Sequence, residues 1–210
     1  RRVPEGARIL DLGVGTGRTT PWLAERGSSY LAIDYAPAMV EAAQRLHPGR
    51  DIRVGDAADL SFVEDGSVDV VVFSYNGIDY LDDEARHRAL DEVVRVLVPG
   101  GTYVFSTHNP RAVAIPPPST GSLPKRWAAA GLMSARRVAR MVPSSAFRSG
   151  EGWILDPVRG GLRTHMATPD RVREELAGHG LEVLEVRNGD EPRRPSTYRT
   201  PWWYYAARRR

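Results

Sequence analysis

The 210-residue sequence contains no cysteine. This absence excludes a disulfide framework, a cysteine-ligated zinc or iron–sulfur site and a thiol nucleophile. The sequence also lacks any run of about 18 apolar residues, so no segment is predicted to span a membrane. No signal peptide is visible, and we therefore expect a cytoplasmic protein. Because the first residue is Arg1 and not methionine, we also expect further residues before it.

Lysine is nearly absent, since Lys125 is the only lysine among 29 cationic residues. The formal net charge of +3 hides a strong asymmetry. Residues 1–107 carry 11 basic and 17 acidic side chains, whereas residues 108–210 carry 18 basic and 9 acidic ones. The second half of the chain is therefore suited to meet an anionic group.

In the first 107 residues, short apolar runs alternate with helical patterns. This alternation is typical of a parallel sheet with right-handed crossovers and predicts a doubly wound α/β fold. Pro99-Gly100-Gly101 predicts a turn before the last of these strands. The predicted strands cover 7–12, 30–34, 51–55, 68–73 and 102–107, and the predicted helices cover 19–26, 37–46 and 82–96.

The pattern breaks between residues 108 and 167. This segment contains Pro116-Pro117-Pro118 and one helical pattern over 125–141, and it carries 9 basic against 2 acidic residues. We interpret it as a lid-like insertion over the sheet edge. Residues 168–210 then predict one helix and two strands. The chain is thus predicted to be a single domain, with a cofactor-binding half (1–107), an insertion or substrate lid (108–167) and a C-terminal part (168–210).

The sharpest motif is Asp11-Leu12-Gly13-Val14-Gly15-Thr16-Gly17, between a predicted strand and a predicted helix. Glycines at this point let the chain turn tightly and let a ligand approach the backbone. A dinucleotide loop needs G-x-G-x-x-G, and here Arg18 occupies the place of the third glycine. An aspartate before the loop also disfavours a pyrophosphate. It favours a ligand that carries an ammonium or sulfonium group.

Two further carboxylates follow the next two predicted strands. Asp34 ends the second strand, where it can accept hydrogen bonds from both hydroxyls of a ribose. Asp56 ends the third strand and can accept from the exocyclic amine of an adenine. Since open α/β sheets bind ligands at the carboxyl ends of their strands, the three acids together describe an adenosine with a positive charge attached.

With these motifs, residues 7–107 resemble the class I S-adenosylmethionine-dependent methyltransferases that act on small molecules. The resemblance implies a seven-stranded Rossmann-like sheet whose last strand is antiparallel. It also implies S-adenosylmethionine as cofactor and S-adenosylhomocysteine as product. The segments that carry it are 9–17, 32–34, 55–57, 73–77 and 97–101.

The same resemblance assigns a role to several residues. Asp11 and the glycines would face the methionine part of the cofactor, Asp34 the ribose, and Asp56 with Ala57 the adenine. Ser74 and Tyr75 would flank the methionine and the transferring methyl. The expected cofactor-binding set is Asp11, Gly13, Gly15, Gly17, Asp34, Tyr35, Met39, Asp56, Ala57, Ser74 and Tyr75.

The catalytic and acceptor-binding residues are less specified. His108 follows the fifth predicted strand, at the edge where an acceptor would sit, and histidine is the natural base near neutral pH. It is our candidate catalytic residue, against the alternative of a loop histidine that orders the insertion. Asn76, Tyr80 and His165 are candidate substrate-binding residues, although Tyr80 fits a core position equally well. No metal is predicted.

The predicted reaction is methyl transfer to an oxygen or nitrogen of a small molecule. Arginines in the insertion, with Trp127 and Trp153, favour an anionic or aromatic acceptor, although a solvated basic helix explains them as well. No nucleic-acid or membrane partner is expected, and the oligomeric state stays open. Two alternatives remain. One is an RNA-modifying methyltransferase, and the other is a non-catalytic partner subunit that binds S-adenosylmethionine.

Overall fold

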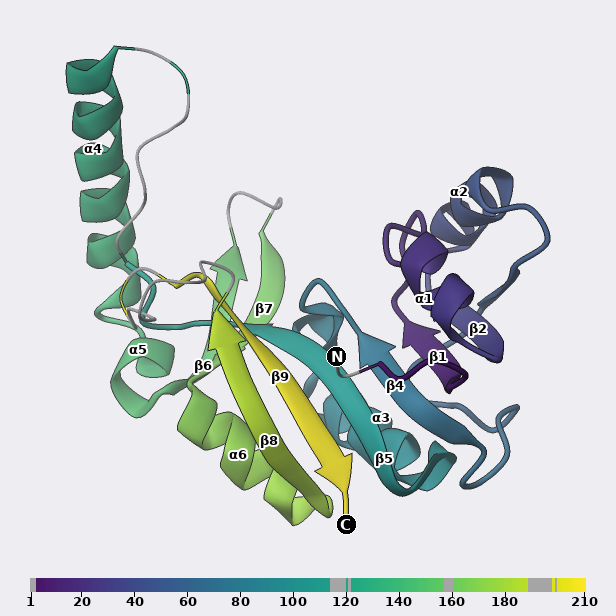
Figure 1. Cartoon of the computed structure of the whole chain (residues 1–210). Helices are drawn as coiled ribbons and strands as arrows, with labels where there is room; N and C mark the ends of the chain where they lie inside the picture. Colours follow the sequence, from purple (N-terminus) through teal and green to yellow (C-terminus); the bar gives the residue numbers. More distant parts are fainter. Residues whose placement is uncertain (1–2, 114–119, 121, 157–160, 189–197, 199) are drawn as a thin grey trace.

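The computed structural model describes residues 3–113, 120, 122–156, 161–188, 198 and 200–210. Its main sheet has seven strands in the order β3-β2-β1-β4-β5-β9-β8 (Figure 1). Strand β9 runs antiparallel to both neighbours, while the others share one direction. The predicted fold is thus confirmed. The strands are β1 (Arg8–Leu12), β2 (Ser29–Asp34), β3 (Asp51–Val54), β4 (Val68–Phe73), β5 (Leu97–His108), β8 (Leu181–Asn188) and β9 (Trp202–Arg209).

Helices cover both faces of this sheet. Helices α1 (Thr20–Arg26) and α2 (Pro37–Leu46) pack on one face, and α3 (Asp83–Val96) and α6 (Pro169–Gly178) pack on the other. Alternating residues of β1 show why both faces need a cover. Ile9 packs toward α1, whereas Leu10 and Leu12 join the core beneath α3 and α6. The continuous apolar sequence of the central strands produces this two-sided burial.

The first half of the chain follows its sequence pattern closely, with one correction. Residues 99–101 form no separate turn, because β5 begins at Leu97 and runs through them. The pairing of β4 with β5 shifts register between Val68 and Val70, and Gly100 has a φ of +78°. The residues predicted to form a turn therefore form an irregularity within β5.

The insertion contains more regular structure than expected. It holds α4 (Leu123–Met141), α5 (Ser145–Ser149) and a two-stranded antiparallel sheet of β6 (Glu151–Asp156) and β7 (Leu162–Ala167). The sequence analysis predicted the long helix but missed the hairpin of β6 and β7. Pro116, Pro117 and Pro118 lie outside the described residues. In the described part of the chain, no helix is both long and apolar enough to cross a bilayer.

Candidate functional site

The loop after β1 requires its glycines for two reasons. Gly13, Gly15 and Gly17 have φ values of +62°, +57° and +86°, which other residues adopt only with strain. A Cβ on Gly13 would also lie 2.9 Å from the ring of Phe73, and one on Gly17 would lie 2.3 Å from the ring of His47. By contrast, a Cβ on Gly15 would meet nothing within 4 Å. The loop is therefore packed from behind and open at its middle glycine.

Asp11 lies buried beneath this loop. Its Oδ2 accepts hydrogen bonds from Thr19 Oγ1 at 2.7 Å and from the Tyr30 hydroxyl at 3.0 Å. Its Oδ1 is buried with no hydrogen-bond partner among the described residues. Burial raises the pKa of Asp11 to about 6, although the two hydrogen bonds oppose the rise. An unpartnered buried carboxylate oxygen suits a cationic group, so the site fits the positively charged methionine end of the predicted cofactor.

Asp34 joins the end of β2 to the glycine loop. Its Oδ2 accepts from the backbone N–H of Gly15 at 2.8 Å, and its Oδ1 accepts from the N–H of Ala36 at 2.9 Å. Each oxygen keeps a second lone pair with which it can accept from a ribose hydroxyl. Tyr35 directly follows β2, and Met39 lies in the first turn of α2. Both side chains are exposed, with 80% and 44% of their surface accessible.

The other predicted adenine-side residues form a small turn. Asp56 is exposed, and its Oδ1 accepts from the backbone N–H of Ala58 at 2.9 Å. Ala57 is buried. Because β3 pairs with β2 so that Val54 lies opposite Asp34, this turn and Asp34 share one edge of the sheet. The structure thus brings the predicted ribose and adenine residues to neighbouring strand ends.

The chain after β4 has an unusual backbone. Tyr75 and Asn76 are both in the left-handed region, with φ values of 54° and 60°. Such conformations cost about 1–3 kcal/mol each and persist only where the surroundings hold them. Here the Arg18 guanidinium lies 4.4 Å from the centre of the exposed Tyr75 ring, and the Asn76 N–H donates to Ser106 Oγ at 3.0 Å. The half-buried Ser74 precedes them.

His108 ends β5 and is held from two sides. Its backbone N–H and its Nδ1 lie 2.6 and 2.8 Å from Asp79 Oδ2. Asn76 Nδ2 lies 3.2 Å from His108 Nε2, and the Tyr80 ring meets the imidazole edge-on at 5.9 Å. With Asp79 Oδ2 as the acceptor, Nδ1–H donates to it, and the Asn76 amide can donate to the lone pair of Nε2. The sequence analysis predicted His108, Asn76 and Tyr80 separately but gave Asp79 no role.

Behind Asp79 lies a buried arginine that the sequence analysis missed. Arg86 on α3 donates from Nη1 to Asp79 Oδ1 at 3.4 Å and, through Nε and Nη2, to both Glu175 oxygens at 2.5 and 2.8 Å. Burial raises the pKa of Glu175, but the hydrogen bond and the charge of Arg86, together with the two nearby histidines, hold that pKa below its usual value. Arg86 follows Asp83 by three positions on a helix rich in charged residues. Nothing in that pattern indicated that the Arg86 side chain would be buried.

The remaining candidate, His165 on β7, lies beside Arg86 and Glu175, with which it lines a cavity. It is buried, and its Nε2 is 3.3 Å from Glu151 Oε1. Burial lowers its pKa, and the charge of Arg86 adds to the effect. It lines a cavity of about 280 Å³ that holds none of the other predicted site residues.

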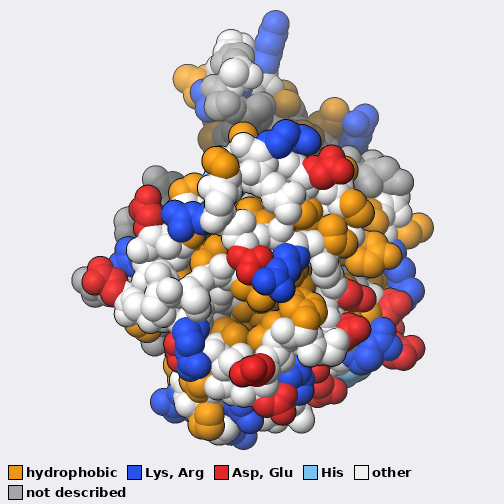
Figure 2. Space-filling model, turned by 90° about the vertical axis from the view of Figure 1, so that its right-hand side faces the viewer, with side chains coloured by type: hydrophobic (Ala, Val, Ile, Leu, Met, Phe, Trp, Pro, Cys, Tyr) orange, Lys and Arg blue, Asp and Glu red, His pale blue; other side chains and the backbone are white. Residues whose placement is uncertain are grey.

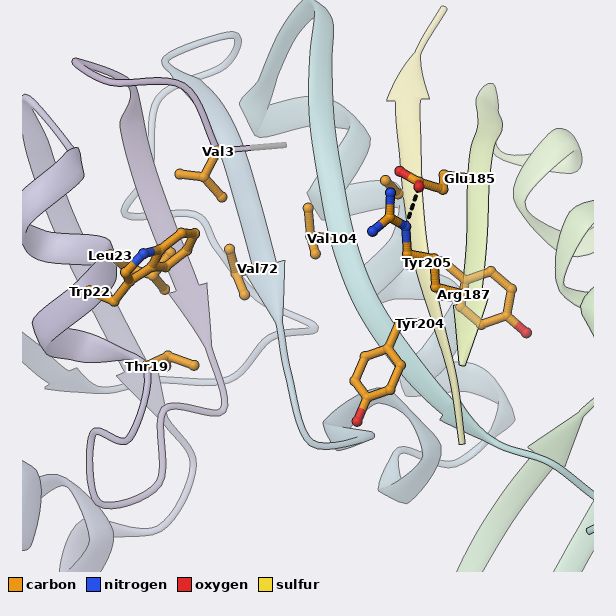
Figure 3. Close-up of a pocket in the computed structure, with 11 residues that line it drawn as sticks. Val3, Thr19, Trp22, Leu23, Val72, Val104, Glu185, Arg187, Tyr204 and Tyr205 are labelled. Atoms are coloured by element: carbon orange, nitrogen blue, oxygen red, sulfur yellow. Dashed lines mark hydrogen bonds and ion pairs between the residues drawn. The ribbon is translucent and has the colours of Figure 1, made fainter. Parts of the chain in front are cut away.

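A separate groove of about 520 Å³ lies on the open sheet face beside α1 (Figures 2 and 3). Figure 2 shows hydrophobic side chains gathered around a paired acidic and basic residue on that side of the molecule. Val72, Val104 and Tyr204 line it, together with Trp22 and the Glu185–Arg187 pair (Figure 3). No predicted site residue lines this groove, so the candidate site is the edge formed by the strand carboxyl ends.

Comparison with known proteins shows which proteins this chain resembles. Residues 9–101 match the family model described as "Methyltransferase domain". A demethylmenaquinone methyltransferase of Clavibacter sepedonicus is 40% identical over 109 residues, which cover 49% of this chain and 42% of that protein. The chain therefore matches less than half the length of this relative.

Solved structures match over the whole chain. An S-adenosylmethionine-dependent methyltransferase from Mesorhizobium loti superposes with a TM-score of 0.71 and 25% identity, over 100% of this chain and 93% of that one. The Burkholderia thailandensis 1,6-didemethyltoxoflavin-N1-methyltransferase, solved with its substrate and S-adenosylhomocysteine, has a TM-score of 0.64 at 15% identity. That match covers 98% of this chain and 72% of that one, and it bears on the fold alone.

Asp11 provides a test of the site by stability. Its raised pKa means that the folded state binds a proton more tightly than the unfolded state, so stability falls as pH rises from about 4 to about 6. Asp11→Asn removes this loss. We expect the variant's stability relative to wild type to grow by about 3 kcal/mol between about pH 4 and about pH 7. Urea unfolding at several pH values measures this, and a difference that does not change with pH contradicts it.

Asp34 provides a test by affinity. If Asp34 accepts from the ribose hydroxyls as predicted, removing its carboxylate should weaken S-adenosylhomocysteine binding about 10–100-fold. Isothermal titration calorimetry of Asp34→Ala checks this, with Asp170→Ala on the exposed start of α6 as the matched control. Unchanged affinity in Asp34→Ala would remove Asp34 from the site.

Proposed function

We propose that the chain is a class I S-adenosylmethionine-dependent methyltransferase and that it methylates an oxygen or nitrogen atom of a small-molecule acceptor. The acceptors named for the Clavibacter and Burkholderia proteins, demethylmenaquinone and 1,6-didemethyltoxoflavin, are small molecules. The chain is similar in fold to the Burkholderia protein, and about half of it is similar in sequence to the Clavibacter protein.

One observation carries the proposal: the contacts that join the glycine loop to His108. Arg18 follows the loop and stacks on Tyr75, and the adjacent Asn76 reaches the His108 ring. The predicted methionine-side residues and the candidate base therefore share one edge of the sheet. An acceptor bound there would lie between them.

The reaction needs position more than covalent help from the protein. S-adenosylmethionine supplies an electrophilic methyl group on a sulfonium, which departs as the neutral thioether of S-adenosylhomocysteine. The residues at this edge would hold the acceptor atom about 3 Å from the methyl and in line with the breaking bond. Asp11, with its unpartnered Oδ1, and Asp34 would fix the cofactor in that orientation.

His108 would take the proton that the acceptor atom loses. Its Nδ1–H is donated to Asp79, so Nε2 is the ring atom available for this proton. The acceptor would displace the Asn76 amide from Nε2. Asp79 acts here as a positioning residue, because it fixes the ring and its tautomer without touching the acceptor.

The first experiment follows a labelled methyl group. The purified chain is incubated with methyl-labelled S-adenosylmethionine and a cell extract supplemented with its small-molecule fraction, and heat-killed protein is the control. We expect label in the small-molecule pool, which also yields the product for mass spectrometry. Label in RNA would overturn the acceptor class. Tight S-adenosylhomocysteine binding without any label would favour the non-catalytic alternative.

The same product then tests His108. His108→Ala should slow label transfer about 10²–10⁴-fold and leave S-adenosylhomocysteine binding unchanged. Asp79→Asn should slow transfer and change its pH profile, because it no longer fixes the tautomer. His87→Ala, on the exposed side of α3, is the matched control. Full turnover by His108→Ala between about pH 6 and about pH 9 would end the assignment of a base.

A further inference from the structure

Helix α4 stands away from the body of the molecule (Figure 1). It has 19 residues, of which Ala130 and Met141 are buried. No helix or strand in the described part of the chain shares more than a marginal contact with it. Helices in proteins gain most of their stability from packing one face against a surface. Among the described residues, most of the surface of α4 has no such partner.

One exposed face of α4 is apolar. Leu123, Trp127 and Val138 are 65%, 63% and 41% exposed, and Val142, directly after the helix, is 40% exposed. Their spacings of 4, 11 and 4 residues place them along a single stripe of the helix. A large aromatic side chain in such a stripe is costly to leave in water.

The charged residues on the other side of α4 are all cationic, and the exposed Leu132 and Met133 lie among them. The helix carries five basic residues and no acidic one, and Lys125, Arg136 and Arg140 among them are exposed. These three share a side of the helix, since they lie 11 and 4 residues apart. The partner that fits α4 is therefore anionic and also able to take up apolar side chains.

We propose that α4 binds the surface of an anionic lipid bilayer, with its apolar stripe among the acyl chains and its basic side chains at the headgroups. Basic amphipathic helices with Trp and Leu on one face lie in such interfaces. A second copy of α4 would bring the five positive charges of one helix next to the five of the other. A nucleic acid would satisfy the cations and leave Leu123, Trp127 and Val138 in water.

This proposal does not depend on methyl transfer. It also differs in kind from a membrane span, for which no helix among the described residues is long and apolar enough. A helix on the surface needs an amphipathic face, not a continuous apolar run. The sequence analysis expected no membrane partner because the chain has no long apolar run. The length of apolar runs tests for a membrane-spanning helix and not for a helix that lies on the membrane surface.

Vesicle flotation tests the binding. At physiological salt, the whole chain should float with vesicles of phosphatidylcholine and phosphatidylglycerol in equal amounts and not with phosphatidylcholine alone. The double variant R136E/R140E should bind at least about tenfold more weakly, and Trp127→Ser severalfold more weakly. The matched control is R45E/L46S at the exposed end of α2, which should float like wild type. Equal losses in both double variants would overturn the proposal.

A reporter on each side of the helix tests the geometry. Because the chain has no cysteine, Val138→Cys or Ala129→Cys can be labelled uniquely with bimane. Ala129 lies 4 residues from Lys125 and 7 from Arg136, and so marks the basic side. Anionic vesicles should shift the bimane emission at 138 to the blue and leave that at 129 nearly unchanged. Equal shifts, or a shift produced by single-stranded RNA or polyglutamate but not by vesicles, would contradict a lipid surface. Unchanged S-adenosylhomocysteine binding confirms that each variant is folded.

Discussion

The fully buried carboxylate of Asp79 connects three parts of the chain. Its oxygens meet the end of β5 through His108 and reach α3 through Arg86, which in turn pairs with Glu175 on α6. Burying charges is costly unless each is paired and hydrogen-bonded, so none of these groups could remain in place alone. The arrangement fixes where β5 ends relative to both helices on its face.

The charges of this cluster also bear on chemistry. Two carboxyl groups, those of Asp79 and Glu175, face the single guanidinium of Arg86, and burial lowers the pKa of the neighbouring His165. If His108 acts as the proposed base, the carboxyl group of Asp79 at its Nδ1 would stabilise the imidazolium that forms when the ring accepts a proton.

A single ring, that of Phe73, links the loops of the site. A Cβ on Gly13 or on Gly77 would lie 2.9 or 2.1 Å from it, so the loops after β1 and β4 both pack against this side chain. The left-handed pair Tyr75 and Asn76 lies between Phe73 and Gly77. The packing of Phe73 on one side and the hydrogen bond from the Asn76 N–H to Ser106 on the other thus maintain the left-handed conformation of that pair.

Local patterns predicted the parts of the site that are local in the chain. The glycine loop, Asp34 and the helix at residues 37–46 each follow from a few adjacent residues, and the structure has that helix at the predicted bounds. The pairing of Asp79 with His108 spans 29 residues, and that of Arg86 with Glu175 spans 89. No spacing rule reaches that far, because these pairs form only once the sheet and its covering helices have assembled.

The two halves of the chain differ in how far their sequences match the family model. The match covers residues 9–101 and stops before His108, the insertion and β9. The cofactor half is constrained by one ligand, so its loops and strand ends have a pattern that sequence comparison recognises. The insertion lies outside this match. Its net positive charge and the exposed apolar stripe of α4 are features of its surface, and no rule for the cofactor half could have predicted them.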